Sequence, residues 1–372
     1  MFVHSKGTAM SAVMDRKSVQ TLIFTAALMG TFALRAEAQD LKPIMDLRGK
    51  WKLEVGDDQE WAKPGFNDQD WTTVTVPSPW ENQGFPGYDG FGWYRKWFFM
   101  PREWEGKRLY IDLGYIDDAD ETYINGHFIA FQGELPPSYV SRYDVGRRYV
   151  IPLYTLKPGE NNLIAVRVYD SQMAGGITHG DVRILEDRNP LSMAQSLEGT
   201  WKFRTGDDLS WKEPAISERG WNTVQVPAFW ETQGFKGYDG YGWYRTTFTL
   251  NDGLEHERLI LFLGKIDDFD EAYLNGQRVG RTGNFPAHGD ADGGDNDFKQ
   301  WRAYTLPMGA LKKGTNVLAI RVYDKYIHGG MYEGPVGLTR RDWYQAWHQH
   351  QPREIRRWDN WGPFRWLEWL FN

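Results

Sequence analysis

Short runs of alternating apolar and polar residues, separated by turns rich in glycine and aspartate, dominate the chain from residue 47 to residue 340. The runs at 47–53 and 197–203 alternate with the period of two that is typical of a strand with one buried face. Asn-Gly pairs follow the alternating runs that end at Ile124 and Leu274, and this dipeptide favours the tight turn of a β-hairpin. The pattern therefore predicts an all-β protein.

Almost every one of these segments occurs twice. The stretch 77–95 matches 227–245 without insertion or deletion, and further matches join 108–114 to 258–264 and 116–126 to 266–276. A repeat of about 140–150 residues has the size of a domain, not of a solenoid unit. Many short strands joined by long loops favour a jelly roll over an immunoglobulin-type sandwich. The sequence thus predicts two tandem jelly-roll β-sandwiches, over residues 45–186 and 196–340.

Each copy carries a glycine-broken loop with a Trp-Glu pair and a Tyr-Asp pair, just before an aromatic strand. Aromatic faces beside carboxylates suit carbohydrates, because a ring can stack on a pyranose while fixed polar groups bind its hydroxyls. The alternative is that the rings fill the edge of each sandwich and that the glutamates bond to backbone within their loop. The candidate ligand-binding residues are Trp80, Glu81, Tyr88, Asp89, Trp230, Glu231, Tyr238 and Asp239.

An acidic loop at 289–297, present only in the second copy, is a candidate metal site. Carboxylate and amide oxygens on a chain bent by glycine suit Ca²⁺. The spacing matches no complete EF-hand, and a solvated acidic loop is the alternative. The candidate calcium ligands are Asp290, Asp292, Asp295 and Asp297; no other cofactor is expected.

The two ends of the chain lie outside the repeat. Arg16 and Lys17 precede an apolar run at 21–34 and a small-residue cleavage site that ends at Ala38, so residues 1–38 are expected to be a secretory signal peptide. The run is shorter than the roughly 20 residues of a membrane span, which favours a secreted or periplasmic protein. Residues 341–372 are rich in Trp and Arg. This tail is expected to pack on its own sandwiches, with a protein partner or a membrane interface as the alternative.

Composition narrows the classes of function. A net charge of −7 argues against a nucleic-acid binder, because no basic face is evident outside the tail. The absence of cysteine excludes disulfides, thiol nucleophiles and cysteine–zinc sites. The sequence contains no Gly-x-Ser-x-Gly elbow, metalloprotease helix or phosphate loop.

Taken together, the repeated motifs resemble the N-terminal sugar-binding domain of glycoside hydrolase family 2, a galactose-binding-like jelly roll. The β-sandwich of sialate O-acetylesterase-like proteins is similar too. The motifs include the Phe-Asn-Asp-Gln-Asp-Trp segment at 66–71, the loop at 77–95, the Asp-Asp hairpin at 116–126 and the Ala-Val-Arg-Val-Tyr-Asp strand at 165–170. The resemblance covers residues 45–340 and implies contact with sugars. Family 2 enzymes keep their catalytic glutamates in a TIM barrel, and the esterases keep their serine in an α/β domain; this sequence lacks the repeated strand–helix alternation of such a barrel.

We therefore expect a secreted, carbohydrate-binding protein with no catalytic residues. Two alternatives stay open. A glycoside hydrolase, or an accessory subunit of one, would use Glu81 with Asp89, or Glu231 with Asp239, as a carboxylate pair. A structural or assembly module would instead bind a protein partner through the Trp-rich tail.

Overall fold

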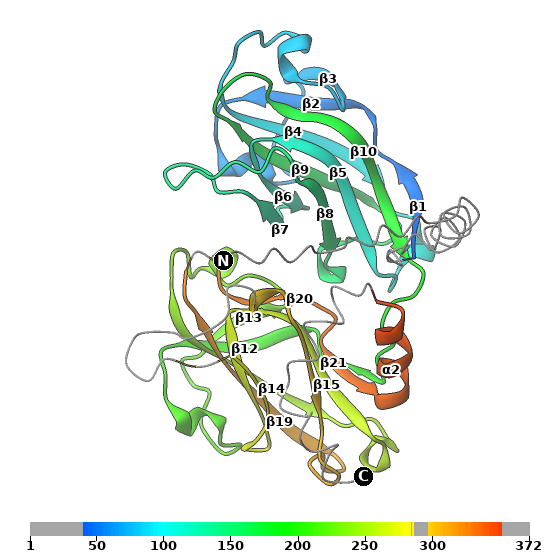
Figure 1. Ribbon diagram of the computed structural model, residues 1–372, viewed down its shortest axis with the longest axis vertical. Helices are drawn as coiled ribbons and strands as arrows, with labels where there is room; N and C mark the ends of the chain where they lie inside the picture. Colours follow the sequence, from blue (N-terminus) through cyan, green and yellow to red (C-terminus); the bar gives the residue numbers. More distant parts are fainter. Residues whose placement is uncertain (1–39, 284, 286–296, 327, 352–372) are drawn as a thin grey trace, which may run out of the picture. The chain divides into compact units, whose positions relative to one another are not determined.

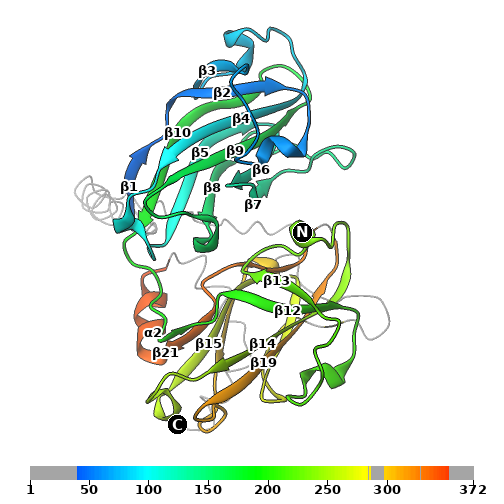
Figure 2. The same cartoon turned by 180° about the vertical axis from the view of Figure 1, so that it is seen from behind.

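The computed structural model describes residues 40–283, 285, 297–326 and 328–351 (Figures 1 and 2). Over these residues the chain is all-β, as predicted, with antiparallel strands in four sheets and one α-helix, α2 (Arg341–Gln349). The expected signal peptide and most of the acidic loop lie outside the described residues. Short 3₁₀ helices punctuate the loops: η1 (Gln59–Ala62), η2 (Trp80–Gln83), η3 (Arg102–Trp104), η4 (Leu153–Thr155), η5 (Leu209–Lys212), η6 (Glu231–Gln233), η7 (Leu254–His256) and η8 (Asp297–Lys299).

Residues 41–187 form two of the sheets. The four-stranded sheet has the order β1 (Leu41–Asp46), β10 (Gly176–Asp187), β5 (Leu109–Asp117), β8 (Gly146–Ile151). The six-stranded sheet has the order β3 (Thr72–Val76), β2 (Gly49–Val55), β4 (Gly90–Phe99), β9 (Asn161–Asp170), β6 (Ala119–Ile124), β7 (His127–Gln132). One apolar core joins them, because Leu53 and Val166 of the larger sheet pack in the same buried cluster as Ile111 and Ile184 of the smaller one. The two sheets are therefore the layers of a β-sandwich.

Residues 195–340 form the other two sheets. Here the smaller sheet contains β11 (Gln195–Ser196), β21 (Gly337–Arg340), β15 (Leu259–Asp267) and β18 (Trp301–Thr305), with β20 (Gly330–Glu333) also paired to β15. The larger sheet has the order β13 (Asn222–Val226), β12 (Gly199–Thr205), β14 (Gly240–Thr249), β19 (Thr315–Asp324), β16 (Phe269–Leu274), β17 (Gln277–Thr282). This order repeats, strand for strand, that of the first six-stranded sheet.

The register of the larger sheets fixes where the central loops end. Gly90 pairs with Asp170 across β4 and β9, and Gly240 pairs with Asp324 across β14 and β19. The last residue of each long strand thus lies beside the first residue after each loop. This pairing brings an aspartate from the C-terminal part of each repeat next to the Trp-Glu and Tyr-Asp pairs.

A tryptophan closes the core at the same end of each sandwich. Trp80 is 0% exposed, and a Cβ added to Gly92 or Gly175 would lie 2.6 or 2.3 Å from its ring. Trp230 is equally buried and lies over Gly242 and Gly329 in the same way. Only glycine leaves room for these rings, so the loop, the strand after it and the turn after β9 or β19 are packed as one unit.

The described part of the tail packs on the protein itself. In α2, Trp347 is buried in a cluster with Leu191, Phe262 and Trp301, and its ring lies 5.7 Å from that of Phe262. Trp343 on the same helix is 36% exposed. Residues 352–372, with the other tail tryptophans, lie outside the described residues. Of the helices in the described ranges, none has the length and apolar character needed to span a bilayer.

Substitution of Gly92 tests the packing of the Trp80 ring. We expect Gly92→Ala to lower the free energy of unfolding by about 1–3 kcal/mol, because the new methyl group overpacks a filled core. Gly65→Ala is the control, since no atom lies within 4 Å of a Cβ at that exposed position. Urea denaturation monitored by tryptophan fluorescence measures both, and equal midpoints for the two variants would contradict the packing described here.

Candidate functional site

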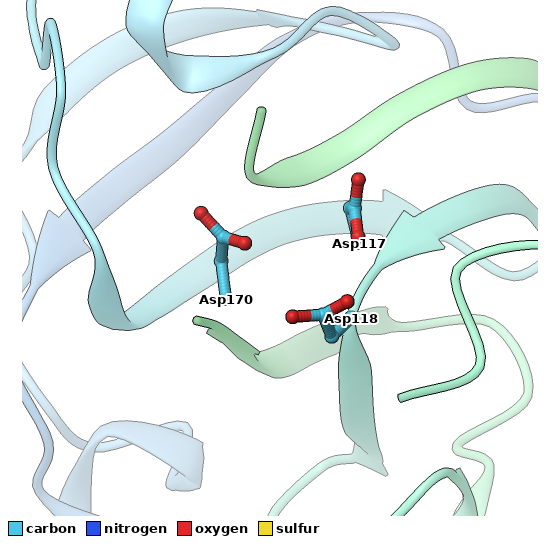
Figure 3. A group of neighbouring side chains, drawn as sticks. All are labelled: Asp117, Asp118 and Asp170. Carbon is cyan, nitrogen blue, oxygen red and sulfur yellow. The ribbon is translucent and has the colours of Figure 1, made fainter. Parts of the chain in front are cut away.

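Two strand ends bring three carboxylates together in the first sandwich. β5 ends at Asp117, Asp118 makes the turn into β6, and β9 ends at Asp170. One oxygen from each side chain lies within 4.8 Å of the other two, as Figure 3 shows. We call this group the first carboxylate cluster. The second sandwich repeats it as the second carboxylate cluster, which consists of Asp267, Asp268 and Asp324.

A buried arginine holds the turn that carries the first cluster. Arg147 donates from Nε to Asp120 Oδ1 at 2.8 Å and from Nη2 to the backbone carbonyl of Asp118 at 2.9 Å. Its remaining Nη1 group donates to the carbonyls of Arg142 and Val145. In the second sandwich Arg302 plays the same part, with bonds to Asp270, Ile266 and Asp268. Because these guanidinium groups donate to Asp120, to Asp270 and to backbone carbonyls, they form no ion pair with the aspartates of the clusters.

Asp118 is the carboxylate of the cluster with the most hydrogen bonds. The hydroxyls of Tyr139 and Ser141 donate to it, as do the backbone N–H and hydroxyl of Ser171. Burial alone would raise the pKa of Asp118, but these donors outweigh it and lower the pKa to about 2. Asp118 is therefore the stably ionised member of its cluster.

The neighbouring aspartate behaves in the opposite way. Burial, together with a hydrogen bond to Asp118 and the charge of Asp118, raises the pKa of Asp117 to about 7. The same causes raise the pKa of Asp267 to about 10. Two adjacent carboxyl groups in this arrangement share one proton near neutral pH.

The third carboxylate of each cluster is buried and has a free oxygen. Asp170 is 0% exposed; its Oδ1 accepts from the backbone N–H of Gln172 at 3.2 Å, and its Oδ2 has no hydrogen-bond partner among the described residues. Asp324 repeats this, with Oδ1 bonded to Tyr326 N at 3.1 Å and Oδ2 unpartnered. Burial raises the pKa of Asp170 to about 7 and that of Asp324 to about 8. A buried acceptor without a donor is rare and needs an explanation.

The acidic residues predicted in the central loops lie near these clusters. Both oxygens of Glu81 accept from the backbone N–H of Gly175, at 3.1 and 3.2 Å, and the charges of Glu81 and Asp89 help to raise the pKa of Asp170. Asp89 itself is exposed.

In the second copy, Glu231 Oε1 accepts from Gly329 N at 3.0 Å, while Oε2 is buried and has no hydrogen-bond partner with good geometry among the residues described. Burial raises the pKa of Glu231 to about 8. The charges of Glu231 and Asp239 act on Asp324 in turn. The structure thus brings these four loop carboxylates within electrostatic reach of the strand-end aspartates.

The aromatic residues predicted in the loops are placed differently from the expectation. Trp80 and Trp230 are fully buried and offer no face for stacking on a sugar, which corrects the prediction made for these two rings. Each indole N–H donates to the carbonyl of the loop tyrosine, at 3.1 Å in both copies. Tyr88 and Tyr238 are half-buried, and their hydroxyls donate to backbone carbonyls at 2.8 Å. The two indole rings pack into the core of each sandwich, together with Tyr88 and Tyr238 of the same loops.

The partly exposed ring of Tyr139 lies at the first carboxylate cluster, and it was not identified from the sequence. Tyr139 is 36% exposed, its hydroxyl donates to Asp118, and its ring meets that of Tyr169 edge-on at 5.4 Å. Tyr139 lies where the two copies diverge, so no internal match points to it. The cluster aspartates did carry a signal, since Ile-Asp-Asp and Tyr-Asp recur in both copies.

Of the predicted calcium ligands, only Asp297 is described. It begins η8, and its Oδ1 accepts from Gln300 Nε2 at 2.9 Å. Asp290, Asp292 and Asp295 lie outside the described residues, so calcium binding by this loop stays a prediction.

Comparison with known proteins gives partial matches. No family model matches the chain. Over 141 residues the chain is 31% identical to the beta-galactosidase BoGH2A of Bacteroides ovatus, which covers 34% of this chain and 15% of that protein. Part of this chain is related to glycoside hydrolase family 2. A beta-glucuronidase of Formosa agariphila is 26% identical over 139 residues, 32% of this chain and 12% of that protein. The matched region is therefore a small part of either relative.

Solved structures of glycoside hydrolase family 2 members also match this chain in part. A glycosyl hydrolase family 2 member from Bacteroides cellulosilyticus covers 76% of this chain and 32% of its own, with 18% identity and a TM-score of 0.34. A beta-glucuronidase from glycoside hydrolase family 2 covers 78% of this chain and 27% of its own, with 16% identity and a TM-score of 0.35. The similarity to sialate O-acetylesterase-like proteins stays a prediction.

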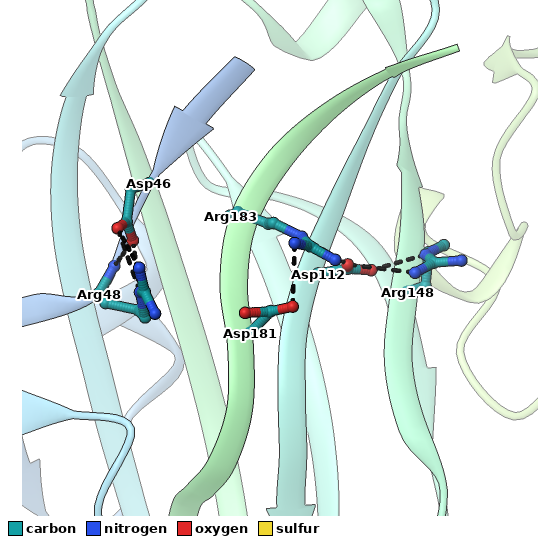
Figure 4. Close-up of polar contacts among 6 residues, drawn as sticks. All are labelled: Asp46, Arg48, Asp112, Arg148, Asp181 and Arg183. Atoms are coloured by element: carbon teal, nitrogen blue, oxygen red, sulfur yellow. Dashed lines mark hydrogen bonds and ion pairs between the residues drawn. The ribbon is translucent and has the colours of Figure 1, made fainter. Parts of the chain in front are cut away.

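Removal of Asp120 tests the support beneath the first cluster. Asp120→Ala leaves Arg147 buried without its counter-ion, and we expect a loss of about 3–5 kcal/mol in the free energy of unfolding. The control is Asp46→Ala, which breaks the exposed pair with Arg48 that Figure 4 shows and should change stability little. Chemical denaturation measures both variants. Equal losses would mean that burial does not set the strength of these pairs.

The raised pKa of Glu231 predicts a pH-dependent stability. The folded-state pKa of about 8 lies above the value of 4.5 for the free side chain. The folded state therefore holds the proton more tightly, and its stability falls as the pH rises from about 4.5 to about 8. Glu231→Gln removes this loss of stability. The Tm of the variant minus the Tm of the unmodified protein should therefore increase as the pH rises from 5 to 9.

Asp208→Asn is the control for this experiment. Hydrogen bonds from Ser210 lower the pKa of Asp208, so that carboxylate stays ionised throughout the range. Its variant should differ from the unmodified protein by a constant Tm offset. A constant offset for Glu231→Gln as well would show that Glu231 does not titrate there.

Proposed function

We propose that this chain is a secreted carbohydrate-binding protein that does not itself cleave glycans, and that it binds sugars at the acidic end of its first sandwich. The observation that carries the proposal is Tyr139, a partly exposed ring that is hydrogen-bonded into a carboxylate cluster. An apolar face next to fixed acceptors is the combination that a pyranose requires. The relationship of part of the chain to a beta-galactosidase supports the same class of ligand.

The acceptors in this proposal are the loop carboxylates. Asp89 is exposed, and Glu81 is held in place by Gly175 N, so both can accept sugar hydroxyls without rearrangement. Hydrogen bonds to a charged acceptor contribute about 1.5–3 kcal/mol each, which makes two of them the main polar contribution. Tyr88 supports the loop from within, because its hydroxyl is bonded to Phe91 O. The equivalent group in the second copy is Glu231, Tyr238 and Asp239.

The spacing of the carboxylates favours binding over hydrolysis. A glycosidase places its two carboxyl groups about 5–5.5 or 6.5–9.5 Å apart, on either side of the bond to be cleaved. The cluster oxygens lie within 4.8 Å of one another, and Asp117 and Asp118 share a hydrogen bond. Because Asp117 and Asp118 are hydrogen-bonded neighbours, these two carboxyl groups do not flank a glycosidic bond from opposite sides.

Export is part of the proposal and rests on the N-terminal sequence. Arg16 and Lys17 before the apolar run at 21–34, and the small residues that end at Ala38, are typical of a cleaved signal peptide.

A second candidate function is glycoside hydrolysis, or service as an accessory subunit of a hydrolase. It is favoured by the names of the two matched relatives, a beta-galactosidase and a beta-glucuronidase. It predicts turnover of a chromogenic galactoside or glucuronide, lost in Glu81→Gln and Glu231→Gln.

Binding to a glycan array, followed by calorimetry with the best ligand, tests the first candidate. We expect Tyr139→Ala to weaken binding by about two- to tenfold, since aromatic stacking contributes about 0.5–1.5 kcal/mol. Tyr139→Phe keeps the ring and should retain most of the affinity. Tyr143→Ala is the matched control, because Tyr143 is an exposed tyrosine in the same loop. Silence across neutral and acidic glycans, or equal losses in the two alanine variants, would overturn the proposal.

A further inference from the structure

We propose that each carboxylate cluster is a calcium-binding site, formed by Asp117, Asp118 and Asp170 in the first sandwich and by Asp267, Asp268 and Asp324 in the second. The inference does not rest on the proposed function, because these residues are distinct from the exposed ring and loop carboxylates assigned to sugar. It accounts for the buried oxygens that have no hydrogen-bond donor.

The geometry of the ligand atoms fits a calcium ion. Ca²⁺ binds six to eight oxygens at about 2.3–2.6 Å, so two of its ligands are at most about 5 Å apart. In each cluster one oxygen per aspartate lies within 4.8 Å of the other two. Figure 3 shows the three side chains of the first cluster, which come from the end of β5, the following turn and the end of β9.

The unpartnered oxygens are the second, independent observation. Asp170 Oδ2 and Asp324 Oδ2 belong to side chains that are 0% exposed, and neither accepts a hydrogen bond from any described residue. A buried acceptor without a donor is rare, and a bound cation would satisfy it. Calcium approaches a carboxylate oxygen to about 2.4 Å, closer than the roughly 2.8 Å of a water molecule. The half-buried Asp117 supplies the open side through which it would enter.

The buried aspartates Asp112, Asp120 and Asp270 are paired with arginine, whereas among the described residues the six cluster aspartates are not. Figure 4 shows Asp112 between Arg148 and Arg183, with contacts of 2.6 and 3.2 Å. Within the described ranges, no cluster carboxylate forms an ion pair with Lys, Arg or His. Three carboxyl groups in contact without a cation repel one another, and a bound dication removes that repulsion.

The chemistry of the ligands selects calcium over other common ions. Zn²⁺ prefers imidazole and thiolate, and the clusters contain neither. Mg²⁺ demands near-ideal octahedral geometry and usually keeps several of its waters, so it is less suited to a cluster of three protein carboxylates. Calcium accepts an all-oxygen, irregular set of ligands. Both features, the close triad and the unpartnered buried oxygen, recur in two copies whose surrounding loops differ.

Calorimetric titration of the EDTA-treated, dialysed protein with CaCl₂, in the absence of any glycan, tests the proposal. We expect two calcium ions per chain from the clusters and a rise in Tm of several degrees. Asp170→Asn should remove one site and Asp324→Asn the other, while each asparagine retains the Oδ1 that accepts from the following backbone. The double variant should bind neither ion and lose the calcium-dependent part of its Tm. MgCl₂ should give neither effect.

Asp112→Asn is the matched control, because it alters a buried carboxylate that already has two arginine partners, and it should keep both sites. Metal analysis of the starting protein excludes ions that survive chelation. No heat and no change in Tm with calcium would overturn the proposal without bearing on sugar binding. Unchanged calcium binding in the double variant would also overturn it, and would assign the ion to the acidic loop at 289–297.

Discussion

A buried arginine–aspartate pair holds the functional end of each sandwich in place. Arg147 is enclosed with Asp120, and Arg302 with Asp270, and all four side chains are removed from solvent. A charge in such a place is tolerated only if every donor is matched, and here the remaining N–H groups go to the backbone on either side of the Asp-Asp turn. The turn carries two of the three cluster carboxylates. The position of these carboxylates thus depends on a pair buried beneath them.

The fold could be predicted because the same pattern occurs in two copies of the repeat. Alternation with a period of two, Asn-Gly turns and a gap-free internal match predicted strands whose limits differ little from those of β2, β5 and β9. The carboxylate clusters were harder to predict, because Asp117 and Asp170 are more than fifty residues apart and meet only through strand pairing. Burial of Trp80 was one of two alternatives that the sequence left open, for a related reason. A tryptophan in a glycine-rich loop looks exposed until the space above Gly92 and Gly175 is known.

The two sandwiches share their framework and differ at the rim. Asp118 takes donors from Tyr139, Ser141 and Ser171, whereas Asp268 accepts from the backbone of Lys325. Tyr139 lies in the part of the repeat where the two sequences diverge. Duplicated cores with different loops therefore give one chain two acidic ends whose hydrogen-bond donors differ.

The tryptophan wedged above two glycines has a consequence for how this protein could change. Because the Trp80 ring fixes the loop to the strands on both sides of it, the loop is not a separable module. Transplanting residues 77–95 onto another scaffold would fail unless the two glycines and the floor of the core travelled with it. Substitutions within residues 77–95 are therefore constrained by the core as well as by the surface, whereas the loop that carries Tyr139 has no such ring packed against two glycines and can vary more freely.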